Sequence, residues 1–86
     1  MNDISWDYYR TFLAVLRTGS LSAAARDLAI TQPTAGRHVE ALEQALGYAL
    51  FTRSQQGLRP TEASLELAPY AEALAATAAA MARHAT

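Results

Sequence analysis

The chain has 86 residues, which is enough to bury the core of one domain and too few for two. It contains no cysteine, and this excludes disulfides and thiolate metal sites. The formal net charge is -1, and the basic residues are seven arginines with no lysine, so composition alone neither supports nor excludes nucleic-acid binding.

The charges are divided unevenly along the chain. Residues 1–61 contain six arginines and five acids, whereas residues 62–86 contain one arginine and three glutamates. The planar guanidinium of arginine can bind guanine or phosphate in two places at once. The slightly acidic total therefore does not exclude nucleic-acid binding by the first part of the chain.

Neither end of the chain indicates a membrane protein. Residues 1–4 lack the positive charge and the apolar segment of a secretory signal. The alanine-rich end is interrupted by Glu72 and Arg83 and is too weakly apolar to span a bilayer. We therefore expect a cytoplasmic protein with no membrane partner.

Two helices are predicted at the start of the chain. Apolar residues at positions 6, 9, 13 and 16 have helical spacing, which predicts a helix over residues 5–18. Gly19 is a typical residue for the end of this helix. Ser20 can then cap a second helix over residues 21–28.

A third helix is predicted after a break of about three residues, which is typical of a helix-turn-helix. Thr31 can cap this helix, and Pro33 fits its first turn, where a missing N–H costs nothing. Apolar residues at 35, 39, 42 and 46 continue the helix until Gly47. The glycine that usually occupies the turn between the two helices is missing.

A minimal hairpin is predicted after the third helix. Residues 50–53 and 58–60 read as two short strands, and Gly57 is expected to take a positive φ between them. Pro60 is tolerated because a two-stranded hairpin has free edges.

A long helix is predicted after Thr61, which can cap it. Pro69 should cost roughly 3 kcal/mol inside a helix, so we expect a bend or a restart over residues 65–69 and fraying over residues 82–86. Small and apolar residues recur in steps of four and three, and this spacing suits pairing with a second helix. The residues expected to form this dimer interface are Leu67, Ala71, Leu74, Ala78 and Met81.

The core is expected to come from the large apolar residues of these elements. They suffice for a small helical domain and are too few for a second one. The expected core residues are Trp6, Phe12, Leu13, Leu16, Leu28, Ile30, Val39, Leu42, Leu46, Leu50, Phe51 and Leu58.

Several short motifs follow one another in a specific order over roughly residues 6–74. They are Phe12-(x)6-Gly19-Ser20-Leu21-Ser22-x-Ala24-Ala25-x-x-Leu28, Gln32-Pro33, Arg37, Leu42-Glu43, Leu46-Gly47, Leu50-Phe51-x-Arg53 and Pro60-Thr61-Glu62-Ala63. In this order and spacing the chain resembles the LysR-type transcriptional regulators.

The resemblance implies a mainly α-helical fold, a winged helix-turn-helix of three helices and a short β-hairpin wing, followed by a long linker and dimerisation helix. It divides the chain into a DNA-binding domain over residues 1–61 and the dimerisation helix over residues 62–86. The implied partners are double-stranded DNA and a second copy of the chain, with a tetramer open for a full-length protein. Family members continue into an effector-binding domain that this chain does not contain, so a small-molecule effector is expected only for a longer protein.

The sequence departs from the family pattern at three residues, of which Gly36 and Ala35, which trims a core side chain, lie in one motif and Ser64 lies in another. Where members commonly have Pro-x-Leu-Ser-Arg, this chain has Pro33-Thr34-Ala35-Gly36-Arg37, and Ser64 replaces a glycine. Gly36 removes a hydroxyl that could contact DNA and costs about 1 kcal/mol of helix stability relative to alanine. The first departure affects the expected base preference.

Three side chains of the third helix are candidates for reading bases. The amide of Gln32 can pair with two groups on an adenine edge, and Thr34 can hydrogen-bond a base or touch a thymine methyl. Arg37 can bind guanine or phosphate, although an i,i+3 ion pair with Glu40 is an alternative role. Pro33 lies between the first two in the same turn.

Other candidates lie at helix starts and on the wing. Thr31 and Ser22 occupy helix N-termini, where hydroxyl and N–H groups face anions, so each can also contact phosphate. Arg53 and Arg59 flank the wing tip and suit a phosphate or the minor groove, with Arg53 at the position that matches the family.

Nothing in the sequence indicates an enzyme. His38 and His84 lie far apart with no carboxylate at metal-ligand spacing, so His38 reads as a surface histidine, and the glycines form no phosphate loop. We therefore expect no catalytic residue, metal site or cofactor. The alternative to DNA binding is a protein–protein module that dimerises through its last helix and has weak or no affinity for DNA.

Overall fold

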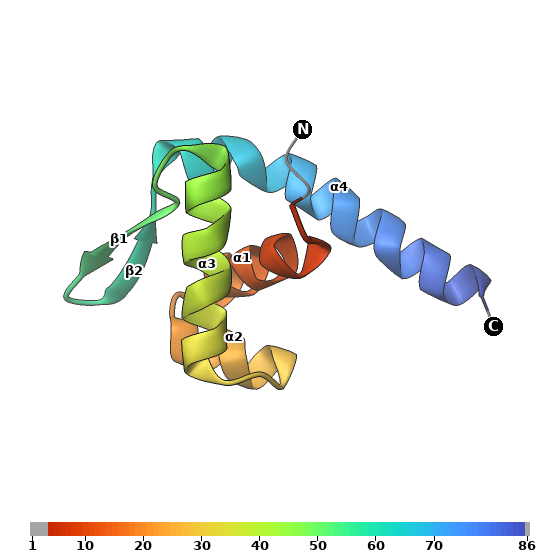
Figure 1. Ribbon diagram of the computed structural model, residues 1–86, viewed down its shortest axis with the longest axis horizontal. Helices are drawn as coiled ribbons and strands as arrows, with labels where there is room; N and C mark the ends of the chain where they lie inside the picture. The colour runs from red at the N-terminus through yellow and green to blue at the C-terminus, as the bar shows by residue number, and fades with distance from the viewer. Residues whose placement is uncertain (1–3, 86) are drawn as a thin grey trace.

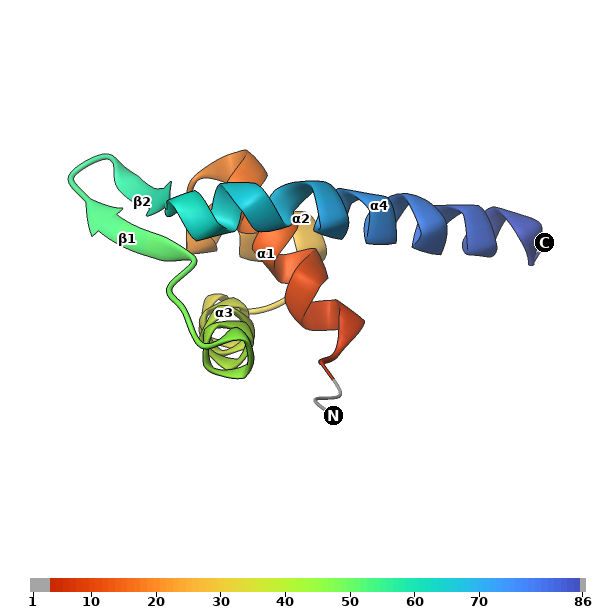
Figure 2. The ribbon, with the colours of Figure 1, turned by 90° about the horizontal axis from the view of Figure 1, so that it is seen from above.

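The computed structural model describes residues 4–85, in which helices come first and a hairpin and a long helix follow (Figure 1). The elements are α1 Trp6–Thr18, α2 Leu21–Leu28, α3 Gln32–Leu46, β1 Phe51–Ser54, β2 Gly57–Pro60 and α4 Glu62–His84. In the view of Figure 2, α3 and α4 lie on opposite sides of α1. This arrangement is the predicted winged helix-turn-helix, mainly α-helical and followed by a long helix.

The helices begin and end at the predicted residues because local polar groups satisfy their free backbone groups. The hydroxyl oxygens of Ser20, Thr31 and Thr61 accept hydrogen bonds of 3.0–3.2 Å from backbone N–H groups three residues later. Gly19 and Gly47 end α1 and α3 in the left-handed region, at φ 83° and 86°. These caps confirm the predicted helix boundaries.

The turn between α2 and α3 is made by an alanine. Ala29 adopts φ 56° and ψ 42°, a left-handed conformation that residues other than glycine rarely take. Its N–H donates to the Arg26 carbonyl, and the N–H of Ile30 donates to the Ala25 carbonyl at 3.0 Å. The helix-turn-helix therefore forms without the usual turn glycine.

Two clusters of buried side chains form the core around α1. One contains Phe12, Leu13, Leu42, Leu50 and Ala71, and the other contains Ala14, Val15, Ala24 and Val39. Half-buried Phe51 packs against both clusters, so the start of the wing is tied to the helices. The predicted large core residues are buried or half-buried, and Leu67 joins them from α4, where the sequence predicts a dimer contact.

The wing is a two-stranded antiparallel hairpin that is fixed to the turn between α1 and α2. β1 begins one residue later than predicted, after the fully buried Leu50, and β2 begins one residue earlier, at Gly57. The N–H of Leu58 donates to the Gly19 carbonyl at 3.2 Å. Gly57 has φ 118°, and a Cβ at this position would lie 2.9 Å from the same carbonyl oxygen, so the site requires glycine.

Helix α4 is a single helix of 23 residues. The alternative of a restart near Pro69 is wrong, because the helix continues through this residue to His84, beyond the point where fraying is expected. Pro69 and Leu65 are exposed, so the carbonyl that lacks its N–H donor can be solvated. No helix within residues 4–85 combines the length and the hydropathy needed to cross a membrane.

Candidate nucleic-acid interface

The first turns of α3 carry polar residues outward and apolar residues inward. Gln32, Pro33 and Arg37 are exposed, whereas Ala35 and Val39 are buried against α1 and α2. This division follows from helical periodicity, since the inner residues recur every three or four positions. The outer face of α3 is thus free for a partner and is held from behind by the core.

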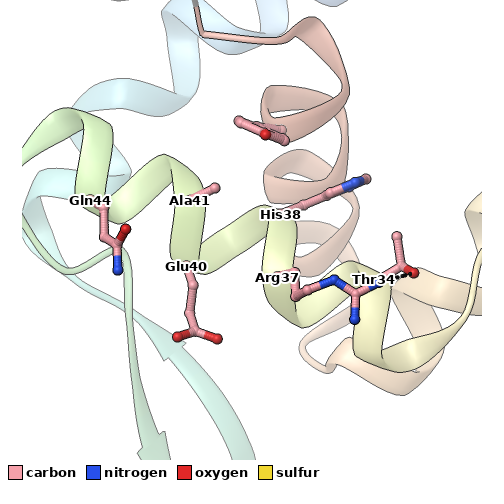
Figure 3. A pocket seen from close by; sticks show the side chains of 7 residues that line it. Thr34, Arg37, His38, Glu40, Ala41 and Gln44 are labelled. Atoms are coloured by element: carbon pink, nitrogen blue, oxygen red, sulfur yellow. Dashed lines mark hydrogen bonds between the residues drawn. The ribbon is translucent and has the colours of Figure 1, made fainter.

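Hydrogen bonds order the side chains at the start of α3. The Thr31 hydroxyl accepts from the N–H of Thr34 and donates to its hydroxyl oxygen at 2.9 Å. The Arg37 guanidinium donates to the same Thr34 oxygen at 3.0 Å (Figure 3). Because the Thr34 oxygen accepts two hydrogen bonds, its own proton stays available for donation to another acceptor.

Arg37 does not form the alternative ion pair within its own helix. Figure 3 shows its side chain extended toward Thr34, while the Glu40 carboxylate points in a different direction. Among residues 4–85, no carboxylate lies within 4.0 Å of the Arg37 guanidinium. A hydrogen bond to a neutral hydroxyl leaves the full positive charge available to an anion or a base edge.

The starts of α2 and α3 and the wing enclose one hollow of about 240 Å³. Ser22 comes from α2, Gln32 from α3 and Arg53 from β1, so the hollow brings together three residues that the sequence predicts separately. The Ser22 hydroxyl also accepts a 3.1 Å hydrogen bond from Arg26. A phosphate or base edge approaching this hollow would meet donors from all three elements.

A second, shallower recess continues the surface along α3. It shares Leu21 and Gln32 with the hollow and reaches Arg37. The predicted DNA contacts therefore lie on one continuous face, which we call the α3–wing surface. It consists of Ser22, Thr31, Gln32, Pro33, Thr34, Arg37 and Arg53.

The two wing arginines lie on different faces of the hairpin. Arg53 pairs with Leu58 across the strands, whereas Arg59 pairs with Thr52. Directly paired residues share a face and successive residues alternate, so Arg53 lies on the side of Leu58 and Arg59 on the other. Arg53 lines the hollow together with Leu58, and Arg59 does not belong to the α3–wing surface.

Sequence reasoning missed a carboxylate that connects α3 to the wing. Glu43 accepts hydrogen bonds from the N–H groups of Leu50 and Phe51, at 2.7 and 3.4 Å. Glu43 belongs to one of the sequence motifs, but its partners lie seven and eight residues later, just before β1 and at its first residue. Glu43 thereby fixes where the wing leaves the helix, and with it the position of Arg53.

His38 is a structural residue rather than the predicted surface histidine. It is half-buried, its Nδ1 lies 2.8 Å from the Thr11 hydroxyl oxygen, and its ring centroid is 5.3 Å from that of Tyr8. Thr11 is 1% exposed in the middle of α1. His38 therefore ties the side of α3 to α1. Within residues 4–85, no group of three potential metal ligands includes it.

The predicted dimer residues of α4 divide into two sets. Leu67 and Ala71 pack on the core of their own chain, and Ala71 is 2% exposed, so it is unavailable to a second chain. Leu74 and Met81 are 42% and 64% exposed, and Tyr70, which the sequence reasoning did not include, is 76% exposed. Ala78 is half-buried at the edge of the groove between α4 and α1.

Solved structures of other proteins are similar to this chain, and one of them contains DNA. The DNA-binding domain of CbnR, solved with DNA, is 30% identical with a TM-score of 0.84, over 94% of this chain and 93% of that one. Oxidised OxyR of Corynebacterium glutamicum is 29% identical with a TM-score of 0.94, over 99% of this chain and 28% of that one.

Sequence comparison identifies the family. The transcriptional regulator HdfR of Escherichia coli is 43% identical over 68 residues, which are 79% of this chain and 24% of HdfR. The chain spans 24% to 34% of the length of the first curated relatives it matches. The sequence model of the bacterial regulatory helix-turn-helix proteins of the LysR family matches residues 6–65. The chain belongs to this family of transcriptional regulators, which are not enzymes, and comprises its DNA-binding winged helix-turn-helix.

Proposed function

We propose that this chain binds double-stranded DNA sequence-specifically as a homodimer, with α3 in the major groove and the wing beside the DNA backbone or minor groove. The observation that carries the proposal is the convergence of Ser22, Gln32 and Arg53 on one hollow, with Arg37 beside it on the same helix. Neither arginine has a carboxylate partner within residues 4–85. Two uncompensated cations on one exposed face suit a polyanion.

In this proposal, α3 reads the bases. An α-helix fits the major groove, where a glutamine amide can pair with both the N6 and N7 groups of adenine and an arginine with both the O6 and N7 groups of guanine. Gln32 and Arg37 are exposed on the side of α3 that faces away from the core, and Pro33 lies between them. The free proton of Thr34 can be donated to a base acceptor or a phosphate.

Contacts to the DNA backbone fix the register of α3 but carry little sequence information. Thr31 and Ser22 lie at the starts of α3 and α2, where backbone N–H groups point outward and favour phosphate. Arg53 reaches the same side from the wing. We therefore assign base preference to Gln32 and Arg37 and general affinity to Arg53.

The dimer in this proposal uses the exposed side of α4. Tyr70, Leu74 and Met81 lie on one side of the helix and have no apolar cover within the described chain. Two α3 helices related by a two-fold axis would read half-sites about 34 Å apart or a multiple of this spacing. Such a regulator acts on chromosomal DNA in the cytoplasm, and a tetramer or a small-molecule effector would require an effector-binding domain beyond residue 86.

The experiment is selection from a random duplex library at about 50 mM salt, followed by measurement of the affinity of single variants. Gln32→Ala should relax preference at one position of each half-site, whereas Arg53→Ala should weaken all duplexes alike and lower the slope of log K against log salt by about 1. Arg59→Ala is the matched control for Arg53→Ala, because it removes an exposed wing arginine from the opposite face and should leave the affinity and the salt slope close to those of the parent chain. Failure of the library to enrich any sequence would overturn the proposal.

A second function is favoured by a different observation. The net charge is -1, Glu40 lies on the rim of the α3 recess, and the largest exposed apolar residues are on α4 rather than at the wing. A protein–protein module that dimerises through α4 without binding DNA would combine these features. It predicts a stable dimer that enriches no duplex even at low salt.

A further inference from the structure

An open recess of about 420 Å³ on the outer face of α3 includes Gly36 in its lining. A Cβ at this position would meet only Leu21, whose Cδ1 would be 3.8 Å away, in ordinary van der Waals contact. The missing side chain therefore leaves part of the half-buried Leu21 side chain open to the surface. With Pro33, these residues provide an apolar floor on a surface that is otherwise polar.

Polar residues surround this floor on the same helix. Gln32, Arg37 and Glu40 line the recess together with the three apolar residues. A partner that packs on this floor must therefore present a small apolar group beside hydrogen-bonding groups. A long aliphatic or aromatic side chain would instead desolvate the charged rim.

The major groove of DNA presents one apolar group of this size. Every base pair carries hydrogen-bond donors and acceptors there, and only thymine adds a methyl group, on its C5 atom. A cytosine at the same position has no methyl group and would leave the apolar floor exposed to water. Burial of a methyl group contributes free energy in proportion to the apolar area removed from water.

We propose that the recess at Gly36 accepts the C5-methyl of a thymine when α3 lies in the major groove, so that the Gly36 departure sets base preference by shape rather than by a hydrogen bond. The inference rests on the proposed function. It assigns the thymine to a position next to the bases that Gln32 and Arg37 read, because these side chains form the rim of the recess. Leu21, on α2, becomes a base-contacting residue through the gap that Gly36 leaves.

The structure offers a direct variant with which to test the recess. Gly36→Ala places a Cβ over Leu21 without a clash, since the nearest heavy atom would be 3.8 Å away. Alanine is also the better helix former, so the variant should unfold at a temperature no lower than that of the parent chain. A change in its DNA preference therefore cannot result from misfolding.

The experiment begins with the sequence that the parent chain enriches from a random library. Each thymine of that duplex is then replaced singly by deoxyuridine, which pairs with adenine but lacks the methyl. One position in each half-site should lose about fourfold in affinity for the parent chain, the effect expected for one buried methyl group. The same replacement should leave the affinity of Gly36→Ala unchanged. Gln44→Ala is the control, because this exposed α3 residue does not line the recess and should keep the full uracil effect.

A second arm changes the sensitive base pair to C·G, with and without a methyl on the cytosine C5. The methylated duplex should bind the parent chain more tightly, again by about fourfold. Equal affinity for thymine and uracil at every position would overturn the proposed role of the recess while leaving DNA binding intact. An undiminished loss of affinity with uracil in Gly36→Ala would do the same. A preference for cytosine at that position would overturn it in favour of Glu40 accepting from the cytosine amine. No enrichment from the library would overturn the proposed function and this inference together.

Discussion

Two regions of the molecule, the body (α1 to α3 with the wing) and the outer half of α4, differ in the contacts that stabilise them. In the body, Phe12, Leu42 and Leu50 are fully buried, and polar caps satisfy the helix ends. In the outer half of α4, residues 73–84, the large apolar side chains are Leu74 and Met81, and both are exposed. The body is thus secured by its own chain, whereas the end of α4 presents an apolar side that a second chain can cover. Separate substitutions can therefore change folding and association independently.

The largest effect is expected for Leu74→Glu, and it should concern association alone. Leu74 is 42% exposed in one chain, so glutamate there should change the unfolding free energy of the monomer by less than about 0.5 kcal/mol. In a dimer that buries Leu74, an unpaired carboxylate costs several kcal/mol. Sedimentation equilibrium should therefore report a monomer at concentrations where the parent chain is a dimer.

Ala76→Glu provides the control for this test. Ala76 is exposed and lies two residues along the helix, about 200° around its axis from Leu74. It should leave the dimer intact. An unchanged mass for Leu74→Glu, or dissociation by both variants alike, would show that the exposed apolar row on α4 is not the interface.

Leu42→Ala should produce the largest loss of stability within the body. Leu42 is fully buried in α3, and truncating such a leucine leaves a cavity as well as removing apolar contact, at a cost of about 3 kcal/mol. Urea unfolding of the monomer measures this cost. Met81→Ala, at a residue that is 64% exposed, should change the same free energy by less than about 0.5 kcal/mol. Similar losses for the two variants would contradict the division between body and outer helix.

Gly57→Ala should destabilise the wing by about 2 kcal/mol. Two causes combine, since φ is 118° and a Cβ would lie 2.9 Å from the Gly19 carbonyl oxygen. Gly47→Ala separates these causes, because Gly47 also has a positive φ of 86° but would place its Cβ more than 4 Å from any neighbour. It should lose about 1 kcal/mol, the strain of the backbone alone. An equal loss at the two glycines would show that the close approach of the wing to Gly19 adds nothing.

Ser64→Ala should stabilise the chain, by about 1 kcal/mol. The Ser64 hydroxyl is fully buried and has no hydrogen-bond partner within residues 4–85, so it has lost its water without compensation. Alanine removes the hydroxyl and is a better helix former. Thermal unfolding should show a higher midpoint for the variant. A lower midpoint would mean that the hydroxyl is satisfied by a bound water.

Local patterns predict the body of this chain well, because its signals act within a few residues. The caps at Ser20, Thr31 and Thr61 are recognised from side chains that reach the next turn, and helical spacing identifies the inner face of α3. Contacts between distant segments are not encoded in this way. Glu43 and His38 find their partners only after the chain folds, so sequence reasoning assigned neither of them a structural contact.

The same limit explains why the sequence predicts the positions of residues on α4 and the wing only in part. Periodicity identifies Leu67, Ala71 and Leu74 as one seam, but it does not say that the first two pack on their own chain. On the wing, Arg53 and Arg59 look equivalent in sequence, and strand register decides which of them lines the hollow. A shift of one residue in a strand moves every side chain to the other face.

The smallest effect is expected at the Arg17–Glu72 ion pair, which joins the body to α4. Both Arg17–Glu72 hydrogen bonds are short, at 2.9 and 3.0 Å, but the two side chains are 59% and 50% exposed. Solvent screens such a pair, so a double-mutant cycle of Arg17→Gln and Glu72→Gln should give a coupling of about 0.5 kcal/mol that declines at about 1 M salt. The buried Ala71 side chain, one residue away, would then be what holds α4 against α1. A coupling above about 2 kcal/mol that persists in salt would instead show that this ion pair is the main contact holding α4 against α1.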